Sequence, residues 1–146
     1  MKAFSVTELI RAPVEDVWAI AGDPERFPQW MRGLGEVSVP HGETLEGGAE
    51  LLVTVSDRGQ TRQSTMRLVQ WDPPHGFALQ AGGPTAGTIY RYCFEPVREG
   101  EATRATLEAE ITVAGKWVFF AWLLKRGMKR SDGGQLKALG YIATGK

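Results

Sequence analysis

Two tyrosines and one glutamate are the residues of this 146-residue chain whose types and positions could do acid–base chemistry. Tyr90 and Tyr92 alternate onto one face of a predicted strand, where their hydroxyls could orient a carbonyl group of a ligand. The same spacing also fits an ordinary cross-strand aromatic ladder, and the sequence leaves both interpretations open. Glu8 is the third candidate, because a carboxylate inside a cavity can transfer protons.

The orientation of Glu8 depends on the regularity of its strand. Glu8 shares one strand face with Phe4, Val6 and Ile10, so a regular strand with this face inside would bury the carboxylate. A strand irregularity before Arg11 would instead turn Glu8 toward solvent. We favour the outward orientation, because glutamate is seldom fully buried without a partner.

The sequence argues against metal, nucleotide and disulfide chemistry. His41 and His75 lie in predicted turns and lack the spacing of a zinc site. The chain has no Gly-x-Ser-x-Gly nucleophile motif, no Gly-x-Gly-x-x-Gly motif and no phosphate-binding loop. Cys93 is the single cysteine, which excludes an intramolecular disulfide and predicts an inert residue in mid-strand. We therefore expect no metal and no cofactor.

Two short helices follow the first strand. Pro13 suits the first position of a helix, and the apolar residues of 14–21 recur at helical spacing. Asp23 and Pro24 repeat the start signal, and Pro28 limits this second helix to about one turn. Two such helices cannot form a core alone, so they must pack against a larger sheet.

Strands in unbroken succession make up the middle of the chain. Apolar alternation and turn signals predict strands over 4–10, 35–39, 49–56, 61–71, 77–81, 88–95 and 103–113. Short turns between successive strands favour an antiparallel meander.

One long helix is predicted from Lys116 to about Ala143. Trp117, Phe120 and Leu124 lie on its apolar stripe, and a basic cluster of Lys125, Arg126, Lys129 and Arg130 follows. Gly133 and Gly134 predict a kink or a close approach to the sheet, because glycine is unfavourable inside a helix.

Five motifs in this order resemble the START-like, helix-grip superfamily, in particular its polyketide cyclase/dehydrase and lipid-transport branch. They are Ile10-x-Ala12-Pro13-x-x-x-Val17-Trp18, Asp23-Pro24-Glu25-Arg26-Phe27-Pro28-x-Trp30-Met31, Trp71-Asp72-Pro73-Pro74, Tyr90-Arg91-Tyr92-x-Phe94-Glu95-Pro96 and Leu136-Lys137-Ala138-Leu139. The resemblance implies an α+β helix-grip fold. In that fold a curved antiparallel sheet of six to seven strands wraps on the long C-terminal helix, with two short helices after the first strand. We expect a single domain over residues 1–146.

The same resemblance implies an apolar cavity between the sheet and the C-terminal helix, since ligand pockets are mostly apolar with a few polar groups. The residues expected to line it are Trp30, Met31, Met66, Leu68, Tyr90, Tyr92, Trp117, Phe120 and Leu124. The alternative is that the aromatic residues among them only pack the core, with Trp30 and Met31 fastening the short helices to the sheet.

Charge and composition limit the classes of binding partner that the sequence indicates. The chain has 17 Lys and Arg against 17 Asp and Glu, so its overall charge does not indicate nucleic-acid binding. The basic cluster of the predicted helix is a solvated face, a weak membrane-surface contact, or a contact with the acidic N-terminal part of the same molecule or of a partner. The absence of a signal-peptide pattern after Met1 and the lone cysteine predict the cytoplasm.

Three functions fit these observations. The first is a cytoplasmic binding protein for a small hydrophobic ligand such as a lipid, an isoprenoid or a polyketide-like molecule. The second is an aromatase/cyclase-type enzyme that acts in the same cavity, with Glu8, Tyr90 and Tyr92 as its candidate groups. The third is an adaptor for a membrane-associated partner.

Overall fold

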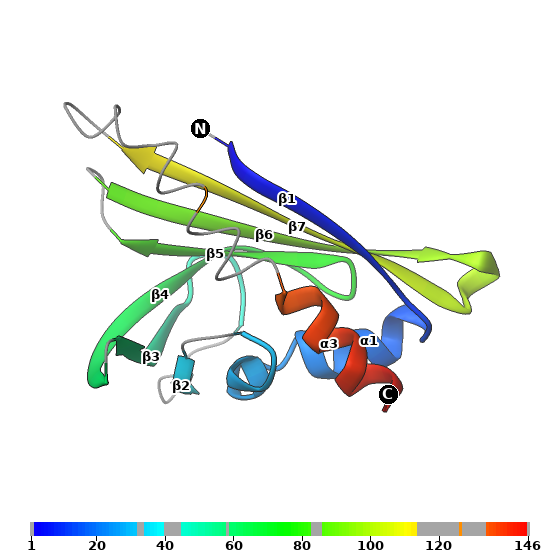
Figure 1. The fold of residues 1–146 in the computed structure, drawn as a ribbon, viewed down its shortest axis with the longest axis horizontal. Helices are drawn as coiled ribbons and strands as arrows, with labels where there is room; N and C mark the ends of the chain where they lie inside the picture. Colours follow the sequence, from blue (N-terminus) through cyan, green and yellow to red (C-terminus); the bar gives the residue numbers. More distant parts are fainter. Residues whose placement is uncertain are drawn as a thin grey trace.

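The computed structural model describes residues 2–31, 34–39, 45–57, 59–82, 86–113, 126 and 134–145. Within these residues one antiparallel sheet of seven strands is the main layer, in the order β1-β7-β6-β5-β4-β3-β2 (Figure 1). Its strands are β1 Lys2–Ile10, β2 Leu34–Ser38, β3 Glu50–Asp57, β4 Gln60–Asp72, β5 Gly76–Gly82, β6 Ala86–Val97 and β7 Ala102–Val113. The predicted antiparallel meander is confirmed, and β1 forms one edge of the open sheet by pairing with β7.

Local sequence explains the tight turns. Gly59 adopts a φ of 79°, which suits glycine, in the hairpin that pairs Asp57 with Gln60. Between β4 and β5 the two prolines of Asp72-Pro73-Pro74 cannot donate to a ladder, and the His75 N–H donates to the Asp72 carbonyl at 2.7 Å. A short 3₁₀ turn, η2 (Arg98–Gly100), joins β6 to β7.

The two short helices lie where they were predicted. Helix α1 spans Val14–Ala21, and η1, a 3₁₀ helix, spans Pro24–Gln29. The Asp23 carboxylate accepts from the Glu25 N–H at 3.2 Å and caps η1. Pro13 stands one position earlier than predicted, at the N-cap, because its extended ψ of 155° places it outside the helix while its carbonyl accepts from Asp16 and Val17.

The described C-terminal helix, α3, spans Gln135–Thr144 and lies beside α1 and β1 (Figure 1). Gly134 is the N-cap of α3 with a non-helical ψ of 0°, so the helix is interrupted at one of the two glycines for which the sequence predicted a kink. Glycine is a poor residue inside a helix but tolerated at its start, which explains this boundary. The rest of the predicted helix, with Trp117, Phe120 and Leu124, lies outside the described residues. In the basic cluster Arg126 is helical and exposed, and the other three residues also lie outside that part of the chain.

The inner face of the sheet carries the core. The buried side chains of β5, β6 and β7 meet α1, η1 and α3 on this side. Trp18 of α1 packs on Trp71, Phe77 and Phe94, with ring centroids 5.1, 6.1 and 6.1 Å away.

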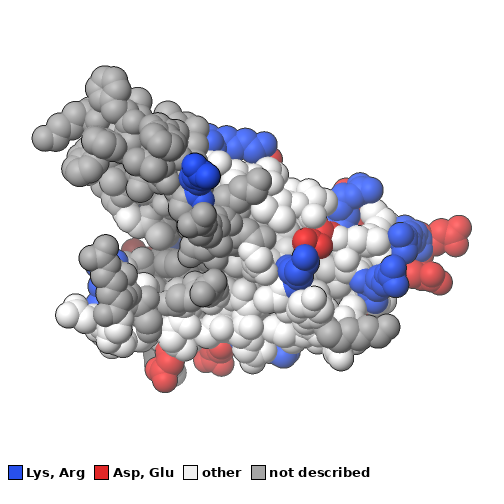
Figure 2. Space-filling view, in the orientation of Figure 1, with Lys and Arg blue, Asp and Glu red and all other residues white. Residues whose placement is uncertain are grey.

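The outer face of the sheet is polar. Arg91 pairs with Glu110 at 3.3 Å and Lys2 with Glu108 at 3.3 Å across β6, β7 and β1. Figure 2 shows side chains of both charge signs at the end where the β6–β7 hairpin projects. Such exposed pairs contribute little to stability. Among the helices that the structure describes, none has the length and apolar character needed to cross a membrane.

Candidate ligand-binding site

A cavity of about 450 Å³ lies on the inner face of the sheet over β3, β4, β5 and β6. Its apolar lining comes from strands β2 to β6 and from the segment after η1. The apolar lining residues are Met31, Leu34, Val53, Val55, Met66, Leu79, Ala81, Tyr90 and Tyr92. Arg62, Gln63, Ser64, Gly82 and Gln135 complete the lining. This volume and this mostly apolar lining are typical of sites for small organic molecules.

The cavity has a buried end and an exposed end. Tyr92, Leu79 and Val53 are nearly inaccessible to solvent, with exposed fractions of 2%, 1% and 3%. Arg62 and Gln63 lie in the exposed first half of β4. A molecule that enters beside β4 would therefore meet polar groups first and apolar walls further in.

A polar pair stands at the buried end. The Tyr92 hydroxyl donates to Gln135 Oε1 at 2.6 Å, and both side chains are buried. The bond joins β6 to the first residue of α3 and satisfies a hydroxyl that would be costly to bury alone.

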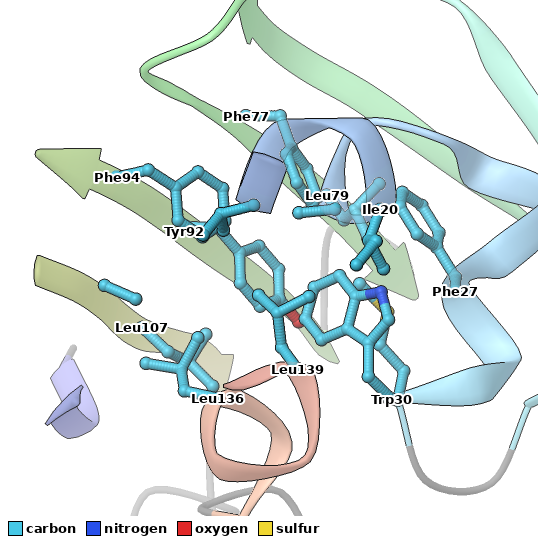
Figure 3. Close-up of a cluster of buried hydrophobic side chains, with 14 of the residues drawn as sticks. Ile20, Phe27, Trp30, Phe77, Leu79, Tyr92, Phe94, Leu107, Leu136 and Leu139 are labelled. Atoms are coloured by element: carbon cyan, nitrogen blue, oxygen red, sulfur yellow. The ribbon is translucent and has the colours of Figure 1, made fainter. Parts of the chain in front are cut away.

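Aromatic packing fixes the Tyr92 ring. Phe77 lies opposite Tyr92 in the β5–β6 register, and the two rings stack at 4.7 Å with an interplanar angle of 25°. Trp30 meets Tyr92 edge-on at 5.3 Å and 85°. Figure 3 shows Trp30, Tyr92, Leu136 and Leu139 pointing toward one another from three elements. The hydroxyl of Tyr92 is therefore held in one direction.

The predicted lining residues divide into three groups. Met31, Met66, Tyr90 and Tyr92 line the cavity. Leu68 and Trp30 lie in the buried core, with exposed fractions of 0% and 3%, and Trp30 reaches the site only through the Tyr92 ring. Trp117, Phe120 and Leu124 lie outside the described residues.

Both tyrosines line the cavity, and Tyr92 also takes part in cross-strand aromatic packing. Tyr92 forms a cross-strand aromatic pair with Phe77 and also lines the cavity. Tyr90 is partly buried and lines the same cavity, on the same strand face. Arg91 lies on the opposite face, where it pairs with Glu110.

The outward orientation of Glu8 is wrong. β1 pairs regularly with β7 from Phe4 to Ile10, and Glu8 lies opposite the fully buried Ala105, so it faces the inner side. There it is partly buried in a separate groove of about 550 Å³ between β1 and α3, next to Lys137 and Tyr141. Glu8 is not in the lining of the cavity that holds Tyr90 and Tyr92, so the three acid–base candidates do not meet.

Sequence reasoning missed Gln135 and the lining from β3 and β5. Alternation in 49–56 and 77–81 could have placed Val53, Val55 and Leu79 on the inner face. Gln135 carried no such signal, because a glutamine in a helix usually faces solvent. Gln135 is buried because α3 begins at this residue, next to the hydroxyl of Tyr92 on β6.

The thiol of Cys93 is exposed on the outer face of β6. Partial desolvation raises the pKa of Cys93, the Glu108 carboxylate raises it further, and Arg91 opposes this shift. A thiol with a raised pKa is a weak nucleophile at neutral pH. Among the described residues no group of three or more His, Cys, Asp or Glu side chains could hold a metal ion.

Comparisons with known proteins agree with this geometry. Residues 1–139 match the model of a family described as polyketide cyclase / dehydrase and lipid transport, which confirms the resemblance in the sequence motifs. A search of curated proteins gives no match.

Solved structures show the same fold at low identity. A protein from Thermus thermophilus has 18% identity and a TM-score of 0.72, over 97% of this chain and 96% of its own. The Zhui aromatase/cyclase from a Streptomyces species has 18% identity and a TM-score of 0.71, over 97% of this chain and 92% of its own. The di-domain ARO/CYC protein BexL has 15% identity and a TM-score of 0.76 over 94% of this chain, which spans 45% of the BexL chain.

Proposed function

Because the chain belongs to the polyketide cyclase/dehydrase and lipid transport family, we propose that it is a cytoplasmic protein that binds one small hydrophobic molecule, such as a lipid, an isoprenoid or a polyketide-like compound. The observation that carries this proposal is the cavity of about 450 Å³ with apolar walls and one polar pair at its buried end. Apolar surface drives binding, and the polar pair orients the ligand.

The proposal predicts how affinity depends on ligand size. Each buried CH₂ group contributes about 0.8 kcal/mol, so affinity should rise about fourfold per carbon until the cavity is full. A series of 2-alkanones of increasing chain length tests this through the quenching of tryptophan fluorescence. Ligand binding should also raise the melting temperature with concentration, because only the folded state binds.

Native mass spectrometry of freshly purified protein, followed by extraction, would identify a retained molecule. A bound apolar molecule of defined mass supports the proposal. If no molecule is retained, and alkanones, isoprenoids and aromatic polyketides all leave fluorescence and melting temperature unchanged, ligand binding is wrong.

A second candidate is catalysis of the aromatase/cyclase type in the same cavity. Two of the solved structures with this fold are named as aromatase/cyclase or ARO/CYC proteins, and the family description includes cyclases. Such catalysis would rest on positioning a reactive chain, with the Tyr92 hydroxyl holding the Gln135 amide, whose N–H groups would polarise a carbonyl. Incubation with a poly-β-ketone and mass analysis of the product tests it. Tyr92→Phe should then lower turnover and leave binding nearly intact.

A further inference from the structure

We propose that Gln135 selects ligands that carry an uncharged carbonyl oxygen, such as ketones, quinones or esters, and that this oxygen lies at the buried end of the cavity. The inference rests on the proposed ligand binding and names the chemical class of the ligand. The contact is a hydrogen bond from Gln135 Nε2 to the ligand oxygen.

The proposal follows from the hydrogen bonds that the Gln135 side chain can form and those that it does form. A primary amide offers one acceptor oxygen and two N–H donors. The Oε1 atom accepts from the Tyr92 hydroxyl at 2.6 Å, and the structure gives Nε2 no partner within the described part of the chain. Gln135 is only 6% exposed and lines the cavity. Nε2 is not a fully buried atom, so its N–H groups are open to the cavity, where a ligand oxygen can take the place of water.

The direction of the donor is set before binding. Phe77 and Trp30 hold the Tyr92 ring from two sides, and the Tyr92 hydroxyl holds Oε1. The amide is also anchored at the first residue of α3. Little side-chain freedom remains to be lost when the ligand binds, so the hydrogen bond adds to affinity with a small entropic cost.

Charge decides between a carbonyl and a carboxylate. Within the described lining of the cavity, Arg62 is the one charged side chain, and it lies in the exposed part of β4. A carboxylate at Gln135 would be buried without a cation, which is costly. A carboxylate ligand would instead place its charge near Arg62, at the exposed end.

Three probes of equal chain length separate these cases: 2-dodecanone, dodecane and dodecanoate. The measured quantity is the ratio of the Kd of dodecane to the Kd of 2-dodecanone, because this ratio cancels the contribution of the common chain. The variant is Tyr92→Phe with Gln135→Met, which removes the amide and also the hydroxyl that could replace it. The matched control is Gln63→Met, which makes the same change at the exposed end.

The expected result is that the ratio falls about tenfold in the double variant, the effect of one lost hydrogen bond, and stays within about twofold of wild type in Gln63→Met. The affinity for dodecanoate should depend on Arg62 and change little in the double variant. An unchanged ratio in the double variant, or an equal loss of dodecanoate affinity, overturns the proposal. If wild type binds none of the probes, including dodecane, the proposed function itself fails.

A measurement on the wild-type protein covers the case in which the variants do not fold. The side-chain amide signals of Gln135 in a ¹⁵N NMR spectrum should shift on addition of 2-dodecanone and remain in place with dodecane. Equal shifts with both probes would contradict a hydrogen bond to the carbonyl.

Discussion

Gly76 lies against the backbone of Tyr92 so closely that a Cβ atom at position 76 would collide with the Tyr92 carbonyl oxygen. The contact joins β5 to β6 at the strand that carries the buried hydroxyl of the cavity. A side chain can move aside, but a carbonyl oxygen inside a sheet cannot move without breaking the ladder. The absence of a side chain at Gly76 therefore allows the β5–β6 pairing that holds Tyr92 in place.

Gly76→Ala should destabilise the protein by about 1–3 kcal/mol, because the added methyl group forces β5 and β6 apart. Urea unfolding measures the change. Gly47→Ala is the matched control, since the nearest atom to a Cβ there is the Val69 carbonyl oxygen at 3.8 Å, an ordinary contact. Equal stability of the two variants would contradict the proposed collision.

Phe77→Ala should cost about 3–5 kcal/mol, the usual range for deleting a buried phenyl group. Phe77 is 2% exposed, stacks on Phe27 at 5.4 Å and on Tyr92 at 4.7 Å, and so joins the short helix η1 to the sheet. Val69→Ala, at a side chain that is 39% exposed, should cost much less. Thermal or urea unfolding of both variants checks the difference.

Tyr92→Phe should destabilise the protein by about 1–3 kcal/mol, because Gln135 Oε1 loses its donor while remaining buried. Gln135→Met tests the other half of the pair. A double-mutant cycle with both substitutions should give a coupling free energy of about 1 kcal/mol. A coupling near zero would mean that the hydrogen bond does not form in solution.

Val53→Phe should fill part of the cavity and weaken the longest alkanones first, because Val53 lines the cavity and is 3% exposed. The neighbouring Leu52 is 50% exposed and faces outward, so Leu52→Phe is the matched control. The affinity series of the 2-alkanones should reach its maximum at a shorter chain in Val53→Phe and remain unchanged in Leu52→Phe. The same maximum in all three proteins would place ligand binding elsewhere.

Cys93 should be alkylated by iodoacetamide more slowly than a free thiol at neutral pH, because desolvation and Glu108 raise its pKa. Glu108→Gln should lower this pKa and shift the pH–rate profile to lower pH. Arg91→Gln should shift the profile in the opposite direction. The opposite signs distinguish an electrostatic effect from a change in access to the thiol.

The strands and the inner face of β6 could be predicted from the sequence because alternation with a period of two is preserved along them. Alternation placed Tyr90 and Tyr92 on one strand face, and the family resemblance, not the pattern, suggested that this face lines a cavity. The orientation of Glu8 was predicted incorrectly, because we gave more weight to the rarity of buried glutamates than to the strand alternation. The structure shows that this alternation is regular up to Ile10. The glycine pair signalled the interruption at Gly134, but the burial of Gln135 depends on how α3 packs beside α1 and β1, and local sequence does not contain that information.

The pairing of β1 with β7 has a consequence for synthesis on the ribosome. Lys2 lies opposite Glu110, and Gln135 follows later still, so β1 must wait for most of the chain before its partner exists. Contacts between residues so distant in sequence slow folding. The hydrogen-bonding end of the cavity is thus among the last parts to form, and a nascent chain lacks the Gln135 amide until α3 has emerged.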